Sequence, residues 1–151
     1  MPIVLRVASD LIVDPRLDQN PPDPARARGR PVKVKGTIAN GATDSATSTY
    51  VLARIPADAI LKDDTWFSTA GWGFATVQVG IPGNPTALIN AAKAAVMTPI
   101  ARGDAKHGLP AWQQLGLAAA PTDNMIEIIA TGPANAAGAG TMPFELSYDH
   151  H

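Results

Sequence analysis

The chain has 151 residues, with 12 Lys or Arg and 13 Asp or Glu, so its formal net charge at pH 7 is -1. This balance excludes a strongly basic nucleic-acid-binding domain, and the 46% of hydrophobic residues exclude a disordered acidic chain. The lack of cysteine excludes disulfides, thiolate nucleophiles and cysteine-bound zinc. We therefore expect a single domain with a packed core and no nucleic-acid partner.

The sequence gives no sign of a membrane or secretory segment. The first residues lack a basic stretch followed by a long apolar run, and Lys93 and Pro99 interrupt the best candidate for an apolar span. We therefore expect a soluble protein, made in the cytoplasm, with no membrane partner.

Residues 14–31 are rich in proline and contain Leu17 as their only large apolar side chain. Because proline lacks the N–H that helices and central strands need, this segment is expected to be an extended arm. Residues 1–35 hold seven basic and four acidic groups, a net charge of +3, which leaves -4 for the rest of the chain. The arm is either a solvated linker or a strap on a neighbouring subunit. As partner-binding residues we assign Arg16, Arg26, Arg28, Arg30, Pro21, Pro22 and Pro24.

The rest of the chain is dominated by short runs of β-prone residues separated by turn signals. Residues 31–39 alternate apolar and polar side chains, which predicts a half-buried strand, and Asn40-Gly41 is a strong turn signal. The predicted strands are 3–7, 11–13, 31–39, 49–55, 60–61, 66–69, 73–81, 125–131 and 141–148.

Two segments are candidates for a helix. Residues 86–97 are rich in alanine and follow Asn84 as N-cap and Pro85 as first helical residue, so they are the best candidate. Residues 110–117 predict one helical turn that ends at Gly116.

These elements predict an all-β fold, an antiparallel jelly-roll-like β-sandwich with one short helix and an extended N-terminal arm. The expected organisation is a strand and arm over residues 1–31, a sandwich over 32–148 and a short tail over 149–151.

The sequence offers little that could support catalysis. Asp104 and His107 could supply two metal ligands, but a site needs three or four. Residues 149–151 also contain potential ligands, but the end of a chain rarely holds them in a fixed geometry. Neighbouring carboxylates at Asp63 and Asp64 would point to opposite faces of a strand, so we interpret them as a turn. We expect no enzyme activity, no cofactor and no metal.

Four aromatic residues, Trp66, Phe67, Trp72 and Phe74, lie close together in the sequence. In two strands of a sandwich such a cluster forms core more often than it binds sugars or bases. Exposure of Trp66, Trp72 or Trp112 in a groove would instead favour a carbohydrate-binding or fibre-associated module.

Residues 32–38 and 49–59 resemble the opening of small tailed-bacteriophage capsid decoration (cement) proteins. The later half also resembles these proteins, with residues 112–117 leading into 125–131 and a closing strand that ends at Tyr148. The resemblance covers about three quarters of the chain and does not include the arm. It implies a self-associating jelly-roll-like sandwich on the outer surface of a capsid.

We therefore expect a virion structural protein that clamps neighbouring major capsid subunits and stabilises the phage head. Its expected partners are the major capsid protein and further copies of itself, as a homodimer or homotrimer. Many weak contacts, repeated with the symmetry of a lattice, add up to strong binding without any active site. The alternative is a ligand-binding sandwich of the carbohydrate-binding or tail-associated kind.

Overall fold

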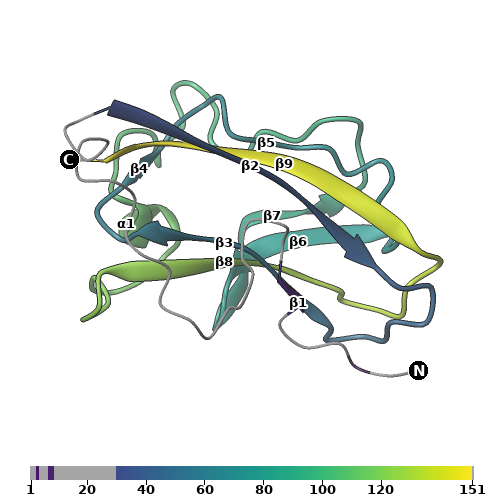
Figure 1. Ribbon diagram of the computed structural model, residues 1–151. Helices are drawn as coiled ribbons and strands as arrows, with labels where there is room; N and C mark the ends of the chain where they lie inside the picture. Colours follow the sequence, from purple (N-terminus) through teal and green to yellow (C-terminus); the bar gives the residue numbers. More distant parts are fainter. Residues whose placement is uncertain (1–2, 4–6, 9–29, 151) are drawn as a thin grey trace.

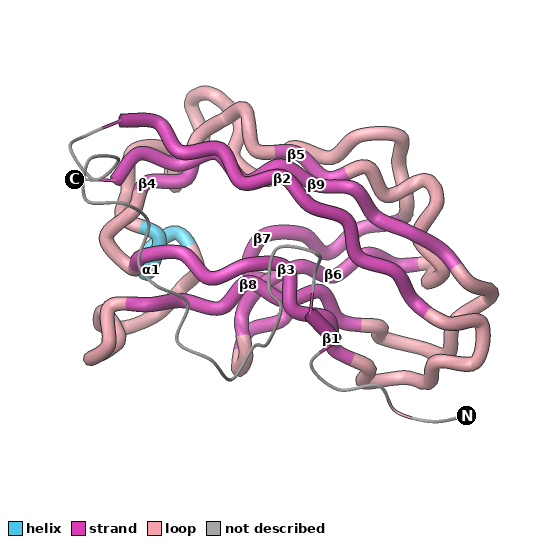
Figure 2. Tube along the Cα trace, viewed as in Figure 1, coloured by secondary structure: helices cyan, strands magenta, loops and turns pink. Residues whose placement is uncertain are grey.

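The structure is a computed structural model that describes residue 3, residues 7–8 and residues 30–150. Its strands form two β-sheets that face one another, with the core between them (Figures 1 and 2). All strand pairs are antiparallel except the short pair of β1 with β3. The predicted all-β sandwich with one short helix is thereby confirmed at the level of its architecture.

The first sheet, sheet A, has the strand order β1-β3-β8-β6-β7. Its strands are β1 (Val7–Ala8), β3 (Thr49–Pro56), β8 (Met125–Thr131), β6 (Thr76–Ile81) and β7 (Asn84–Ala92). The predicted strand over residues 125–131 is confirmed as β8, with Ile126 and Ile128 in the core and Glu127 on the other face.

The second sheet, sheet B, has the order β2-β9-β4, and β5 also pairs with β9. Its strands are β2 (Arg30–Asn40), β9 (Gly140–His150), β4 (Ile60–Leu61) and β5 (Trp66–Phe67). β2 and β9 pair along their whole length, from Arg30 opposite His150 to Asn40 opposite Gly140. Pro31 and Asp149 therefore lie inside strands, one residue beyond each predicted boundary of the sandwich.

The predicted helix over residues 86–97 is wrong, because the chain forms β7 as far as Ala92 and a non-helical loop over residues 93–97. Pro82 and Gly83 form a tight turn that pairs Asn84 with Ile81, and Gly83 has φ +90°, which glycine adopts without a steric penalty. Pairing with β6 then places Ile89 opposite Val79 in the core. The buried apolar contacts of a strand outweigh the helix propensity of alanine in this segment.

The second predicted helix is confirmed as α1 (Ala111–Gln114), and Gly116 follows it with φ +77°. The predicted strands at 66–69 and 73–81 are shorter than expected, since β5 ends at Phe67 and β6 begins at Thr76. The residues between them form a loop whose backbone bonds to β9 at Pro143 and Thr141 and to the loop residue Ala137.

Aromatic side chains fill the space between the two sheets. Tyr50 on β3 meets Trp72 edge-on, with 5.2 Å between ring centroids, and Phe67 on β5 stacks on Phe144 of β9 at 6.2 Å. Each fully buried aromatic contributes roughly 2–3 kcal/mol from the apolar area it removes from water. The largest fully buried side chains are Trp72, Tyr50, Phe67, Phe74 and Phe144.

Candidate functional site

The outer face of sheet B carries a network of four charged side chains. Residues directly opposite one another in an antiparallel pair share a face, so Lys35 on β2 and Glu145 on β9 both point away from the core. Lys33 lies two residues before Lys35 and shares its face. Asp64, in the turn that precedes β5, completes the network.

Glu145 is the centre of this charged network. Lys33 Nζ lies 3.1 Å from Glu145 Oε1 and 3.1 Å from Asp64 Oδ2, and Lys35 Nζ lies 3.3 Å from Glu145 Oε2. Only 7% of the Glu145 side chain is exposed, compared with 74% for Lys35. The carboxylate is therefore shielded by the two lysines, and the four charges balance within the face.

The pKa values in the network follow from these contacts. Burial alone would raise the pKa of Glu145, but hydrogen bonds and charges from Lys33 and Lys35 outweigh it and hold the pKa below its ordinary value. The pKa of Lys33 is raised, mainly by its hydrogen bond to Asp64 and to a smaller extent by its hydrogen bond to Glu145. Both shifts favour the charged forms of Glu145 and Lys33 near neutral pH, so the face presents paired charges.

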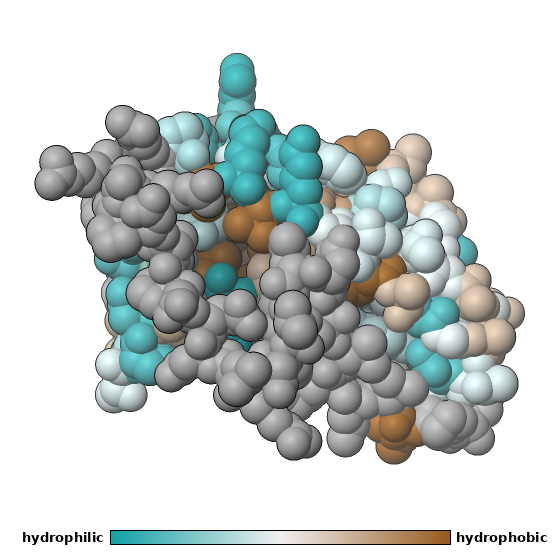
Figure 3. Space-filling view, viewed as in Figure 1, coloured by the Kyte–Doolittle hydropathy of each residue, from teal (hydrophilic) through white to brown (hydrophobic). Residues whose placement is uncertain are grey.

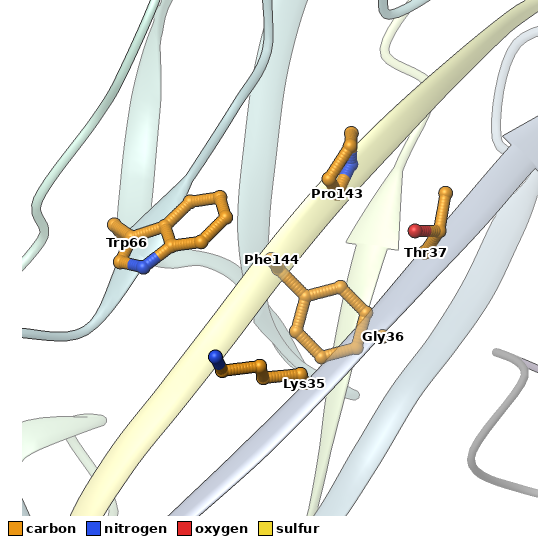
Figure 4. A pocket seen from close by; sticks show the side chains of 6 residues that line it. All are labelled: Lys35, Gly36, Thr37, Trp66, Pro143 and Phe144. Atoms are coloured by element: carbon orange, nitrogen blue, oxygen red, sulfur yellow. The ribbon is translucent and has the colours of Figure 1, made fainter.

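A shallow depression of about 290 Å³ lies beside the network on the same face. Figure 4 shows the Trp66 indole on one side of β9 and Thr37 on the other, with Pro143 between them. The Lys35 side chain extends across β9 toward Trp66 (Figure 4). The depression is lined by Lys35, Gly36, Thr37, Trp66, Pro143 and Phe144.

The aromatic cluster divides between the core and this surface. Phe67, Trp72 and Phe74 are at most 1% exposed, as expected for core residues, whereas Trp66 is partly exposed and lines the depression. The signal that could have separated them is the alternation of a strand, because Trp66 and Phe67 are neighbours in β5 and must point to opposite faces.

The two weaker candidates for metal ligands do not form a site. The N–H of His107 donates to the carbonyl of Asp104 in a turn, and both residues are exposed. Among the residues that the structure describes, no group of three His, Cys, Asp or Glu could hold a metal ion. At the other end of the chain, Asp149 and His150 belong to β9 and pair with Lys62 and Asp58 instead.

Most of the partner-binding residues assigned from the sequence lie outside the described residues. The exception is Arg30, whose backbone begins β2. Those outside are Arg16, Arg26, Arg28, Pro21, Pro22 and Pro24.

Within the described part of the chain, no helix is long and apolar enough to cross a membrane. Compared with protein-family models, curated proteins and solved structures, the chain gives no match.

Proposed function

We propose that this protein is a tailed-phage virion protein that decorates the outer surface of the capsid and stabilises the head by clamping neighbouring major capsid subunits. The resemblance at residues 32–38 and 49–59 supports the proposal. Residues 32–38 lie within β2, and residues 49–59 contain the whole of β3, which belongs to the other sheet. The proposal includes the finer jelly-roll assignment of the sandwich and its assembly as a homo-oligomer.

The observation that carries the proposal is the outer face of sheet B. Tryptophan is enriched among the residues that contribute most to protein–protein binding, and Trp66 is partly exposed on this face. Trp66 offers the anchor, and the charged network beside it is balanced, so a partner need not supply opposite charges to cover it. β2 and β9 hold this face on a paired scaffold of eleven residues each.

The test is the heat stability of phage heads assembled without this protein. Adding the purified chain to such heads is expected to raise their melting temperature, because a ligand that binds only the assembled lattice stabilises it. Trp66→Ala is expected to remove most of this increase, whereas Trp112→Ala, a tryptophan outside the depression, is the matched control and is expected to keep it. An unchanged melting temperature with the wild-type chain would refute the proposal.

A second candidate function is carbohydrate binding at the same depression. Indole rings stack on sugars, and Trp66 lines the same depression as Lys35, whose ammonium group could bind hydroxyls. A shift of tryptophan fluorescence on adding glycans, lost in Trp66→Ala, would favour this function over capsid binding.

A further inference from the structure

Among the residues that the structure describes, those at one end of the sandwich carry almost no charge. Four segments meet there, and we call them together the neutral end: residues 41–47, 70–75, 91–96 and 132–139. Their only ionisable side chains are Asp44 and Lys93. Asp44 is 6% exposed and accepts hydrogen bonds from the N–H of Gly41 and the hydroxyl of Tyr50. The Lys93 Nζ donates to the carbonyl of Trp72 at 3.0 Å.

The neutral end is assembled from parts of the sequence that lie far apart. Residues 65–101 contain Lys93 as their only charged side chain, residues 36–53 contain only Asp44, and residues 128–144 contain none. The two sheets bring the loops of all three stretches to the same end of the molecule, which lies at the right in Figures 1 and 3.

The opposite end of the sandwich, around β4 and α1, has the reverse character. Ion pairs there join Arg102 to Asp63, Lys62 to Asp149 and His150 to Asp58. Charged side chains are common in surface loops, and the loops at the β4 and α1 end of this sandwich accommodate them. The absence of charge at the neutral end is therefore not a requirement of the sandwich.

Hydrogen bonds between the loops fix the shape of the neutral end. The N–H of Ala137 donates to the carbonyl of Gly73 at 2.8 Å, and the N–H of Ala136 donates to that of Asp44 at 2.9 Å. A Cβ on Gly73 would lie 2.1 Å from the carbonyl oxygen of Gly138, so only glycine allows this approach. A surface fixed in advance loses little conformational entropy when a partner covers it.

We propose that the neutral end is the surface on which a second copy of this chain docks. In a two-fold dimer the residues close to the axis meet their own counterparts, so an exposed charge there faces the same charge and is repelled. A surface with one exposed ammonium, itself bound to a backbone carbonyl, avoids this repulsion. Val96, which is 60% exposed, and its alanine neighbours supply the apolar contact. A strongly charged partner would find no complementary group there.

The inference rests on the homo-oligomeric assembly that the proposed function includes. The experiment is sedimentation of the purified chain without capsids, so its failure can be distinguished from a failure of capsid binding. We expect the wild-type chain to form dimers or a higher symmetric oligomer at micromolar concentration. Ala95→Glu and Ala95→Lys are each expected to weaken self-association about tenfold or more, because like charges then meet across the axis. Mixing the two variants is expected to restore it, since opposite charges then face one another.

Ala119→Glu is the matched control, because Ala119, like Ala95, is an exposed alanine and lies outside the neutral end. It is expected to leave self-association unchanged. A monomeric wild-type chain would overturn the inference, and so would Ala95 variants that associate like the wild type. Loss of association that mixing does not rescue would also overturn it, because it would show damage to the fold instead of repulsion between copies.

Discussion

The side chain of Asn40 accepts a hydrogen bond from the backbone N–H of Gly73 at 3.0 Å and so ties the last residue of β2 to the loop between β5 and β6. The same amide donates to the carbonyl of Gly138 at 2.8 Å. One buried side chain thus holds together three parts of the chain that are distant in sequence.

Replacing this amide tests how far it stabilises the loops. Asn40→Ala is expected to lower the free energy of unfolding by roughly 1–3 kcal/mol, because it leaves the N–H of Gly73 and the carbonyl of Gly138 without their partner. Urea denaturation measures the loss. Asn135→Ala, which removes an exposed amide in the same region, is the control and is expected to change stability by less than about 0.5 kcal/mol. Equal effects of the two variants would contradict this account.

The turn between β6 and β7 makes a second prediction. Gly83 has φ +90° and nothing within 4 Å of a Cβ placed on it, so Gly83→Ala is expected to cost about 1–2 kcal/mol from backbone conformation alone. Gly138 has equally open surroundings and no positive φ, so Gly138→Ala is expected to be nearly neutral. Thermal unfolding of the two variants side by side checks the difference, and a neutral Gly83→Ala would show that this turn has been described wrongly.

The charged network predicts how stability depends on pH. Since the pKa of folded Glu145 is below its ordinary value of 4.5, its contribution is fully present above that value and is lost as the pH falls through the lowered pKa. The pKa of Lys33 is raised, so its contribution is present at neutral pH and is lost only as the pH rises above the ordinary value of 10.5 and through the raised one.

Glu145→Gln is therefore expected to unfold at a lower temperature than the wild type at pH 7 and to lose less stability on acidification. The melting temperature, measured between neutral pH and about pH 3, checks this difference in slope. Lys93→Gln removes a lysine elsewhere and is expected to keep the wild-type slope. An acid slope in Glu145→Gln as steep as that of the wild type would exclude this carboxylate as its cause.

The arm makes a prediction that rests on the sequence alone. Replacing Arg26, Arg28 and Arg30 by Ala is expected to weaken capsid binding and to make the remaining binding less sensitive to salt, because charge–charge contacts are screened by ions. Binding measured at low and high salt with wild-type and variant chains checks this. Unchanged binding at both salt concentrations would mean that the arm is a linker.

Much of the fold follows from the sequence, because alternation over residues 31–39 marks a strand with one face turned to the core, and the β-prone run at 125–131 marks a second strand. The prediction fails at residues 86–97, because alanine has a strong local preference for helix. Pairing with β6 overrides this preference, and a local sequence pattern does not reveal that pairing. The turn at Pro82-Gly83 was the available signal, since it returns the chain along β6.

Less of the candidate site follows from the sequence. The alternation places Lys33 and Lys35 on one face, but only the register between β2 and β9 brings Glu145 beside them. The prediction that Asp63 and Asp64 form a turn is confirmed. The ion pair of Asp64 with Lys33, by contrast, could not be predicted from the sequence. Pairing register is set by contacts across the whole sheet, which a local pattern does not contain.

Co-sedimentation of the purified chain with phage heads assembled without it tests the proposed function most directly. The account predicts saturable binding at micromolar protein, with a fixed number of copies per capsid subunit and a clear loss of affinity in Trp66→Ala. A chain that stays in the supernatant at every concentration tested, while remaining folded, would contradict it.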